Sequence, residues 1–259
     1  MDLRYKFDED VDNYDKWRPK YTTALFNEII CRSSLGRGKE ALEIGIGTGQ
    51  ATLPILLSGC KVTAIDIGER LVEYSRRKFE RWSSFNVINI GFEDYEKKCN
   101  TYDLIYSATA FHWIEEDIGF NKIYRLLKPG GTVALFWNHP FVNREDEPLH
   151  SEIQRQYFRI HHHKISPVEF NESKCNRYKK LLNDYGFINI SSTIYRDIRR
   201  LNADEYVSLL NTYSDHRAIG KERKKLLESE IARLINKHGG ELSIYDTMDL
   251  YIANKPLVN

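Results

Sequence analysis

The sequence predicts an α/β protein whose parallel sheet is covered by helices on both faces. Short apolar runs alternate with helix-length amphipathic segments from about residue 39 to residue 137. The runs are almost continuously apolar, which is typical of strands that are buried on both faces. The first run turns through three closely spaced glycines, Gly45, Gly47 and Gly49, into a helix-compatible segment. A strand that turns through glycines into a helix is typical of a nucleotide-binding site, because the backbone can approach the ligand and the helix presents free N–H groups.

The elements follow in order along the chain. The first 35 residues are expected to be helical, with Thr22 and Thr23 as candidate N-caps. The glycine-rich segment 128–131 is expected to stop one helix before the next strand begins. Strands are expected at 39–44, 61–66, 86–90, 102–107 and 132–137, and near 187–198 and 244–252; helices at 50–58, 69–82, around 118–127, and near 204–210 and 219–237.

One domain accounts for the whole chain, because 259 residues can bury a substantial single core and no repeat or linker interrupts them. Its expected parts are an N-terminal helical cap (1–35), a ligand-binding core (36–140), a helical insertion that we place on the substrate side (141–185), and the final strands and helices (186–259).

Composition excludes several function classes. The 38 lysines and arginines nearly balance the 37 aspartates and glutamates, so no basic surface for nucleic acid is expected. The first eight residues lack the apolar core of a signal peptide, and no apolar run approaches the ~20 residues of a membrane span. The four cysteines, without a closely spaced pair, are typical of free thiols in a reducing compartment. We therefore expect a cytoplasmic protein; its oligomeric state is not indicated.

No metal site is expected. The run 161–163 consists of three histidines, but three consecutive side chains cannot all point one way, and no nearby cysteine or acid pair completes a ligand set.

The acid before the glycine turn favours one class of ligand. A dinucleotide turn has the spacing Gly-x-Gly-x-x-Gly, whereas here Gln50 stands where the third glycine should be. Glu43 precedes the first glycine by two residues, and its carboxylate would repel a pyrophosphate. The same carboxylate would favour a ligand with an ammonium group, such as an amino-acid moiety.

Further candidates follow the next strands, at the edge of the sheet where open α/β folds place ligands. Asp66 ends the second strand and can accept hydrogen bonds from both ribose hydroxyls, although a helix-capping role is the alternative. The segment 92–94 could hold adenine between an aromatic face and an acid. Phe111 and Trp113 after the fourth strand could face a sulfonium, or be core residues. His112 between them could orient a substrate, take its proton, or make a structural hydrogen bond.

As an ordered set, these residues resemble the class I S-adenosylmethionine-dependent methyltransferases, in particular their small-molecule branch. The set consists of Glu43-x-Gly-x-Gly-x-Gly49, Asp66, Phe92-Glu93-Asp94, the segment Ser107–Trp113 and Leu127-Lys128-Pro129-Gly130-Gly131. The segment Tyr14-Asp15-Lys16-Trp17-Arg18-Pro19-Lys20-Tyr21 is similar to one in trans-aconitate methyltransferase-like proteins. The resemblance covers about residues 10–140.

The resemblance implies a Rossmann-like sheet of seven strands, the last one antiparallel, with the cofactor across the strand ends. Arg18 would then bind the carboxylate of S-adenosylmethionine, Asp66 the ribose, and Glu93 would lie near adenine; an N-terminal helix whose arginine simply packs is the alternative. The cofactor-binding residues that it implies are Tyr14, Trp17, Arg18, Tyr21, Glu43, Gly45, Gly47, Thr48, Gly49, Asp66, Ile67, Phe92, Glu93, Ser107, Ala108, Phe111 and Trp113.

The expected reaction is direct in-line attack of a small-molecule nucleophile on the sulfonium methyl, with S-adenosylhomocysteine as product. The protein must mainly align the reactants and exclude water. His112 is the candidate general base if the nucleophile needs one. Two alternatives are a non-catalytic S-adenosylmethionine-binding module and a nicotinamide-dependent oxidoreductase.

Overall fold

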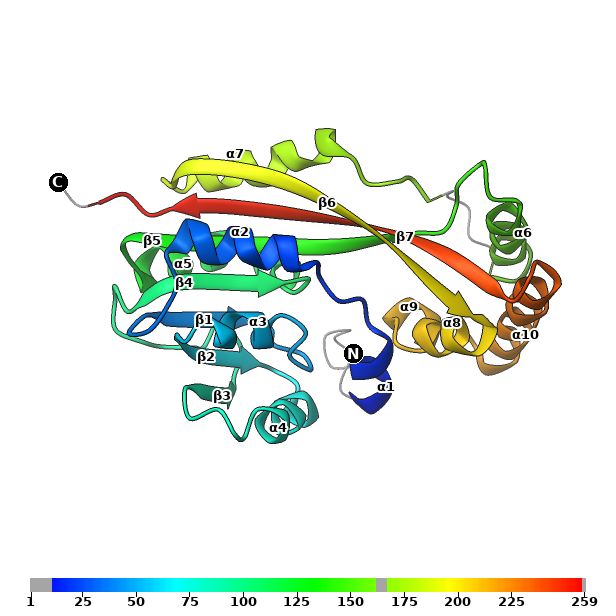
Figure 1. Ribbon diagram of the computed structural model, residues 1–259, viewed down its shortest axis with the longest axis horizontal. Helices are drawn as coiled ribbons and strands as arrows, with labels where there is room; N and C mark the ends of the chain where they lie inside the picture. Colours follow the sequence, from blue (N-terminus) through cyan, green and yellow to red (C-terminus); the bar gives the residue numbers. More distant parts are fainter. Residues whose placement is uncertain (1–10, 162–166, 258–259) are drawn as a thin grey trace.

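A computed structural model of the chain describes residues 11–161 and 167–257, and its centre is a seven-stranded sheet (Figure 1). The strand order is β3-β2-β1-β4-β5-β7-β6. The first five strands run parallel, whereas β7 is antiparallel to both of its neighbours. The expected α/β class, including the antiparallel last strand, is therefore confirmed. The strands are β1 (Glu40–Ile44), β2 (Lys61–Asp66), β3 (Phe85–Asn89), β4 (Tyr102–Ala108), β5 (Leu127–Phe141), β6 (Ile188–Asn202) and β7 (Glu241–Asn254).

Helices cover both faces of the sheet because successive residues of each buried strand point to opposite sides. In β4, Leu104 belongs to one apolar cluster and Ile105 to the other. The first cluster joins the sheet to α2 (Thr23–Ser33), α3 (Thr52–Leu57) and α4 (Glu69–Lys78); the second joins it to α5 (Glu116–Leu126) and α7 (Asn176–Asp184). Thr22 caps α2, since its side chain accepts a hydrogen bond from the backbone N–H of Leu25.

The antiparallel end of the sheet extends well beyond the parallel strands and carries a second group of helices (Figure 1). This helical layer consists of α6 (Pro148–Gln156), α8 (Ala203–Leu210), α9 (Ser214–Arg217) and α10 (Lys221–Lys237), with η3 (Tyr157–His161) continuing α6. Leu209 and Ile231 pack there against Leu242 of β7 in a third apolar cluster. The layer thus has its own core, held at the far end of the long strands.

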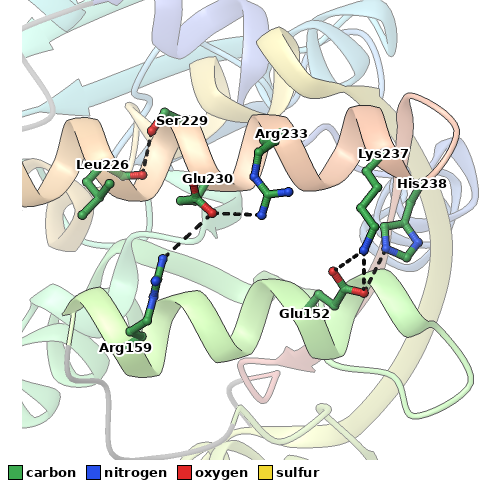
Figure 2. A network of polar contacts seen from close by, with 8 residues as sticks. All are labelled: Glu152, Arg159, Leu226, Ser229, Glu230, Arg233, Lys237 and His238. Carbon is green, nitrogen blue, oxygen red and sulfur yellow. Dashed lines mark hydrogen bonds and ion pairs between the residues drawn. The ribbon is translucent and has the colours of Figure 1, made fainter.

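Polar contacts join α6 and η3 to α10 on the outer side of this layer (Figure 2). Lys237 and His238 both donate to the carboxylate of Glu152, at 3.3 and 3.2 Å. Glu230 lies 3.0 Å from Arg233 and 3.9 Å from Arg159. Exposed ion pairs contribute little to stability, so the apolar cluster beneath them holds the layer together.

Residues 141–185 divide between two places in the fold. α6 and η3 join the helical layer, whereas η4 (Glu172–Cys175) and α7 return to the sheet beside β6 and β7. None of the helices in the described part of the chain has the length and apolar character needed to span a membrane. The first eight residues, which were considered for a signal peptide, lie outside the described residues.

The glycine-rich segment 128–131 differs from its expected role as a break. α5 ends at Leu126, and β5 begins at the next residue and runs through the glycines. The segment joins the strand because it pairs with the end of the chain: the N–H of Gly130, whose φ is +76°, donates to the carbonyl of Lys255, and the N–H of Lys255 to the carbonyl of Gly131. A partner more than 100 residues away therefore sets this conformation.

Gly49 offers a test of how tightly the glycine turn packs against the end of α4. Its φ is +80°, and a Cβ there would lie 2.4 Å from Cε2 of Phe79. Gly240, with φ +85°, has no described atom within 4 Å of an added Cβ. Both alanine variants introduce left-handed strain, but only Gly49→Ala overpacks the core, so it should lower the unfolding free energy by about 1–3 kcal/mol more than Gly240→Ala. Urea unfolding of both variants measures this; equal losses would contradict the packing argument.

Candidate functional site

A cavity of about 310 Å³ lies at the carboxyl ends of β1, β2 and β4. This is the edge at which open parallel sheets bind ligands. α1 (Val11–Trp17) and α9 close it from the opposite side. The described residues of its wall are Tyr14, Arg18, Ile44, Gly45, Gly47, Ile65, Asp66, Ile67, Leu71, Ile90, Phe92, Glu93, Ala108, Thr109, Ala110, His112, Trp113, Ile114, Tyr213 and Asp215.

The glycine turn and Asp66 form one rigid corner of the cavity. The backbone N–H groups of Gly47 and Gly68 donate to the two carboxylate oxygens of Asp66, at 2.8 and 2.9 Å. Each carboxylate oxygen can accept a second hydrogen bond, so the side chain is fixed yet still able to bind a hydroxyl. A Cβ on Gly45 would lie 2.4 Å from the Cβ of Ala110, so the turn can pass this close to the loop after β4 only because residue 45 is a glycine.

The loop after β3 supplies a mostly apolar part of the wall. Phe92 and Glu93 line the cavity beside Ile67 and Ile90. Lys122 of α5 holds this loop from behind, since its ammonium group donates to the carbonyls of Phe92 and Glu93 at 3.1 and 2.7 Å. Such a surface, with one acid at its edge, can accommodate an aromatic base.

Glu43 lies behind the turn and does not line the cavity. Its side chain is only 1% exposed, and Oε2 accepts hydrogen bonds from Thr52 at 2.7 Å and from Tyr106 at 2.8 Å. Burial raises the pKa of this carboxyl to about 7. At this position Glu43 supports the turn from the core side. Its contact with an ammonium group stays a prediction. Six other residues of the predicted set also lie outside the described wall: Trp17, Tyr21, Thr48, Gly49, Ser107 and Phe111.

The N-terminal segment contributes two of its four predicted residues to the wall. The guanidinium of Arg18 lies 4.7 Å from the ring centroids of both Tyr14 and Tyr213 and donates to the carbonyl of Thr212. These contacts hold the positively charged guanidinium in the wall of the cavity. Tyr21 lies deeper, hydrogen-bonded to Thr109 at 2.6 Å, and Trp17 packs against the apolar cluster of the helical layer.

His112 is held in one orientation by a tryptophan of β5. Nε1–H of Trp137 donates to Nδ1 of His112 at 3.0 Å. Indole can only donate, so Nδ1 must accept, and a neutral imidazole then carries its proton on Nε2. Removal of water from around the ring, together with nearby His139, lowers the pKa of His112. The arrangement presents a neutral N–H donor in the wall of the cavity.

Nine described wall residues are absent from the predicted list of site residues, although Thr109 and Ala110 lie within the predicted segment Ser107–Trp113: Ile44, Ile65, Leu71, Ile90, Thr109, Ala110, Ile114, Tyr213 and Asp215. Thr109 and Ala110 follow β4, and Thr109 has a φ of +52°. Such a φ is uncommon outside glycine, and no local sequence signal indicates it. Tyr213 and Asp215 come from the helical layer, far along the chain from the glycine turn. Only the tertiary fold brings them to the cavity.

In the described part of the chain, no group of three or more histidines, cysteines, aspartates or glutamates is placed to hold a metal ion. His162 and His163 lie outside the described residues.

The pKa of Glu43 predicts a pH dependence of folding. A folded-state pKa of about 7, against a usual value of 4.5, means that the folded protein retains this proton while the unfolded chain loses it. Unfolding free energy should therefore fall by about 3 kcal/mol as the pH rises from 4.5 to 7. Glu43→Gln keeps an acceptor for Thr52 and Tyr106 but cannot ionise, so its stability relative to the native protein should rise across this window.

Urea unfolding at several pH values between 5 and 8 measures this difference. Glu73→Gln, which removes a half-exposed acid of α4, is the matched control and should show little pH-dependent change. Parallel pH profiles for the native protein and Glu43→Gln would contradict the assignment.

Known proteins match the chain in sequence and in fold. A family model described as a methyltransferase domain matches residues 41–131. An uncharacterized methyltransferase-like protein of Schizosaccharomyces pombe is 26% identical over 235 residues, which cover 89% of this chain and 86% of that protein. Juvenile hormone acid O-methyltransferase of Drosophila melanogaster is 25% identical over 173 residues, 62% of this chain and 58% of that enzyme.

Among solved structures, phosphoethanolamine N-methyltransferase 2 of Haemonchus contortus, in complex with S-adenosylhomocysteine, has a TM-score of 0.57. It is 17% identical, and the match covers 99% of this chain and 61% of that one, a likeness of fold alone. The family match includes the glycine turn, Asp66 and the segment after β4, which are the parts that build the cavity. The chain therefore carries a methyltransferase domain, and its relatives and its fold support class I S-adenosylmethionine-dependent methyl transfer.

Proposed function

We propose that the cavity binds S-adenosylmethionine and that the enzyme transfers its methyl group to an oxygen atom of a small molecule. The observation that carries the proposal is the cavity itself. A glycine turn, a fixed carboxylate at Asp66 and apolar side chains around Phe92 meet in one space of about 310 Å³. Relatives support a small acceptor, since one of them is named for juvenile hormone acid.

Each part of the cofactor has a partner of matching chemistry in this wall. Asp66 would accept from the ribose hydroxyls, and the surface around Phe92 and Glu93 would take adenine. Arg18 would bind the carboxylate of the amino-acid end. Asp215 is an exposed acid that shares this part of the wall with Arg18 and Tyr213, so it would bind the ammonium group that the sequence had suggested for Glu43.

The bound cofactor supplies an activated methyl group, and the chain's own residues position the acceptor. His112 would donate its Nε2–H to the nucleophilic atom. An oxygen has two lone pairs, so it can accept this hydrogen bond with one while the other attacks; an amine nitrogen has only one. The geometry therefore favours an oxygen nucleophile, and a carboxylate would need no base. Because Nε2 carries the proton and Trp137 occupies Nδ1, His112 is poorly placed to be the general base considered from the sequence.

Asp66→Asn tests cofactor binding. Loss of the charge weakens hydrogen bonds from the ribose, so the Kd for S-adenosylhomocysteine should rise about 10- to 100-fold in isothermal titration calorimetry. Asp184→Asn, which changes an exposed acid of α7 outside the described wall, is the matched control and should bind as the native protein does. NADH should not compete. Unchanged affinity in Asp66→Asn, or tight binding of NADH, would count against the proposed site.

The tautomer of His112 can be observed directly by ¹⁵N NMR of the labelled protein at neutral pH. We expect protonation at Nε2 alone, and Trp137→Phe should release the ring into a mixture of tautomers because it removes the N–H that donates to Nδ1. Once an acceptor is found, kcat/KM should fall about 10- to 100-fold in His112→Leu. It should recover in part in His112→Gln, which restores an N–H donor. A proton on Nδ1 in the native protein would refute the donor role.

A further inference from the structure

A second cavity, of about 260 Å³, lies between the helical layer and the far ends of β5 and β7. Five of its described wall residues are aliphatic side chains or prolines near those strands and on α8: Pro140, Val142, Leu209, Leu210 and Ile244. The methyl-transfer chemistry proposed above uses none of them.

Three polar side chains of this wall, Gln154, Tyr157 and His216, make hydrogen bonds within the protein. Tyr157 shares a hydrogen bond of 2.8 Å with Nε2 of His216, and the amide of Gln154 donates to the carbonyl of Val142 at 2.6 Å. No lysine or arginine is among the described residues that line the space. Nearby Arg199 is paired with Asp246 and is mostly buried. The cavity therefore offers a ligand mainly hydrocarbon surface and no described cationic partner.

Two residues belong to both cavities, namely Tyr213 and Asp215. One face of the segment after α8 thus borders the proposed cofactor site, and another borders the apolar space. A ligand in the second cavity would therefore lie next to the first cavity, with Tyr213 and Asp215 at the boundary between the two spaces.

We propose that the second cavity holds the apolar body of the methyl acceptor, an uncharged alkyl, terpenoid or ring system, while its oxygen-bearing end reaches the cofactor past Tyr213. This inference rests on the proposed function. The volume corresponds to roughly nine water molecules at ~30 Å³ each, and so to a body of about that many non-hydrogen atoms. Burial of such a body supplies binding energy remote from the reacting atoms, which can be used to position them.

The test uses 1-octanol as a neutral apolar probe and the full-length protein saturated with S-adenosylhomocysteine, so that the first cavity is filled. Binding is measured by ligand-observed NMR titration. Leu210→Trp projects a larger side chain into the second cavity and should weaken octanol binding at least about tenfold. Val142→Phe narrows the same space from β5 and should act in the same direction if the tryptophan variant does not fold.

Leu226→Trp is the matched control. Leu226 is 50% exposed on α10, one turn before Glu230 (Figure 2), and it is not among the described residues that line either cavity. This variant should bind octanol as the native protein does. All three variants should keep the native affinity for S-adenosylhomocysteine, because no substituted residue lines the first cavity.

The outcomes separate the two proposals. Octanol binding that is lost in Leu210→Trp or Val142→Phe but kept in Leu226→Trp supports the acceptor cavity. No octanol binding to the native complex, or equal binding to all variants, overturns it. Failure of the native protein to bind S-adenosylhomocysteine instead overturns the proposed function, and octanol binding without the cofactor product then reports on the second cavity alone.

Discussion

The site depends on the tight turn after β1, which two carboxylates hold from opposite sides. On the cavity side, Asp66 accepts from the backbone N–H of Gly47. On the core side, Glu43 accepts from Thr52 at the start of α3 and from Tyr106 of β4. The turn is thus tied to the neighbouring strands on both sides, so its backbone is already arranged before any ligand arrives. Such preorganisation lowers the conformational cost of binding.

The opposite wall of the cavity depends on the unusual length of the antiparallel strands. β5, β6 and β7 run beyond the parallel sheet and carry the helical layer. The α9 region of this layer brings Tyr213 and Asp215 to the first cavity. α1 completes this wall: Asn13 donates to the carbonyl of Ser208 in α8, and Asp15 accepts from Tyr74 of α4. One short helix therefore bridges the parallel part of the fold, through α4, and the helical layer, through α8.

The sequence predicts what short-range patterns encode. Apolar runs located all seven strands, and the strand–glycine–helix pattern located one corner of the cavity, because these features lie within a few residues of one another. It does not predict the direction of Glu43, since the same residue could face the ligand or the core until Thr52 and Tyr106 are in place. Nor does it predict that Asp215 lines the cavity, or that Gly130 and Gly131 pair with Lys255, because these contacts join segments that are distant in the sequence.

The charge of His112 connects the fold to the chemistry. A protonated imidazole in this wall would set a second positive charge near the proposed sulfonium, at a cost that rises as water is excluded. Two features keep the ring neutral. Its pKa is lowered by loss of water and by His139, and Trp137 directs an N–H at Nδ1, which a protonated ring could not accept. Trp137 in turn stacks on Tyr178 of α7, with ring centroids 4.5 Å apart. A helix packed on the sheet therefore helps to fix which nitrogen of the histidine would face the proposed acceptor.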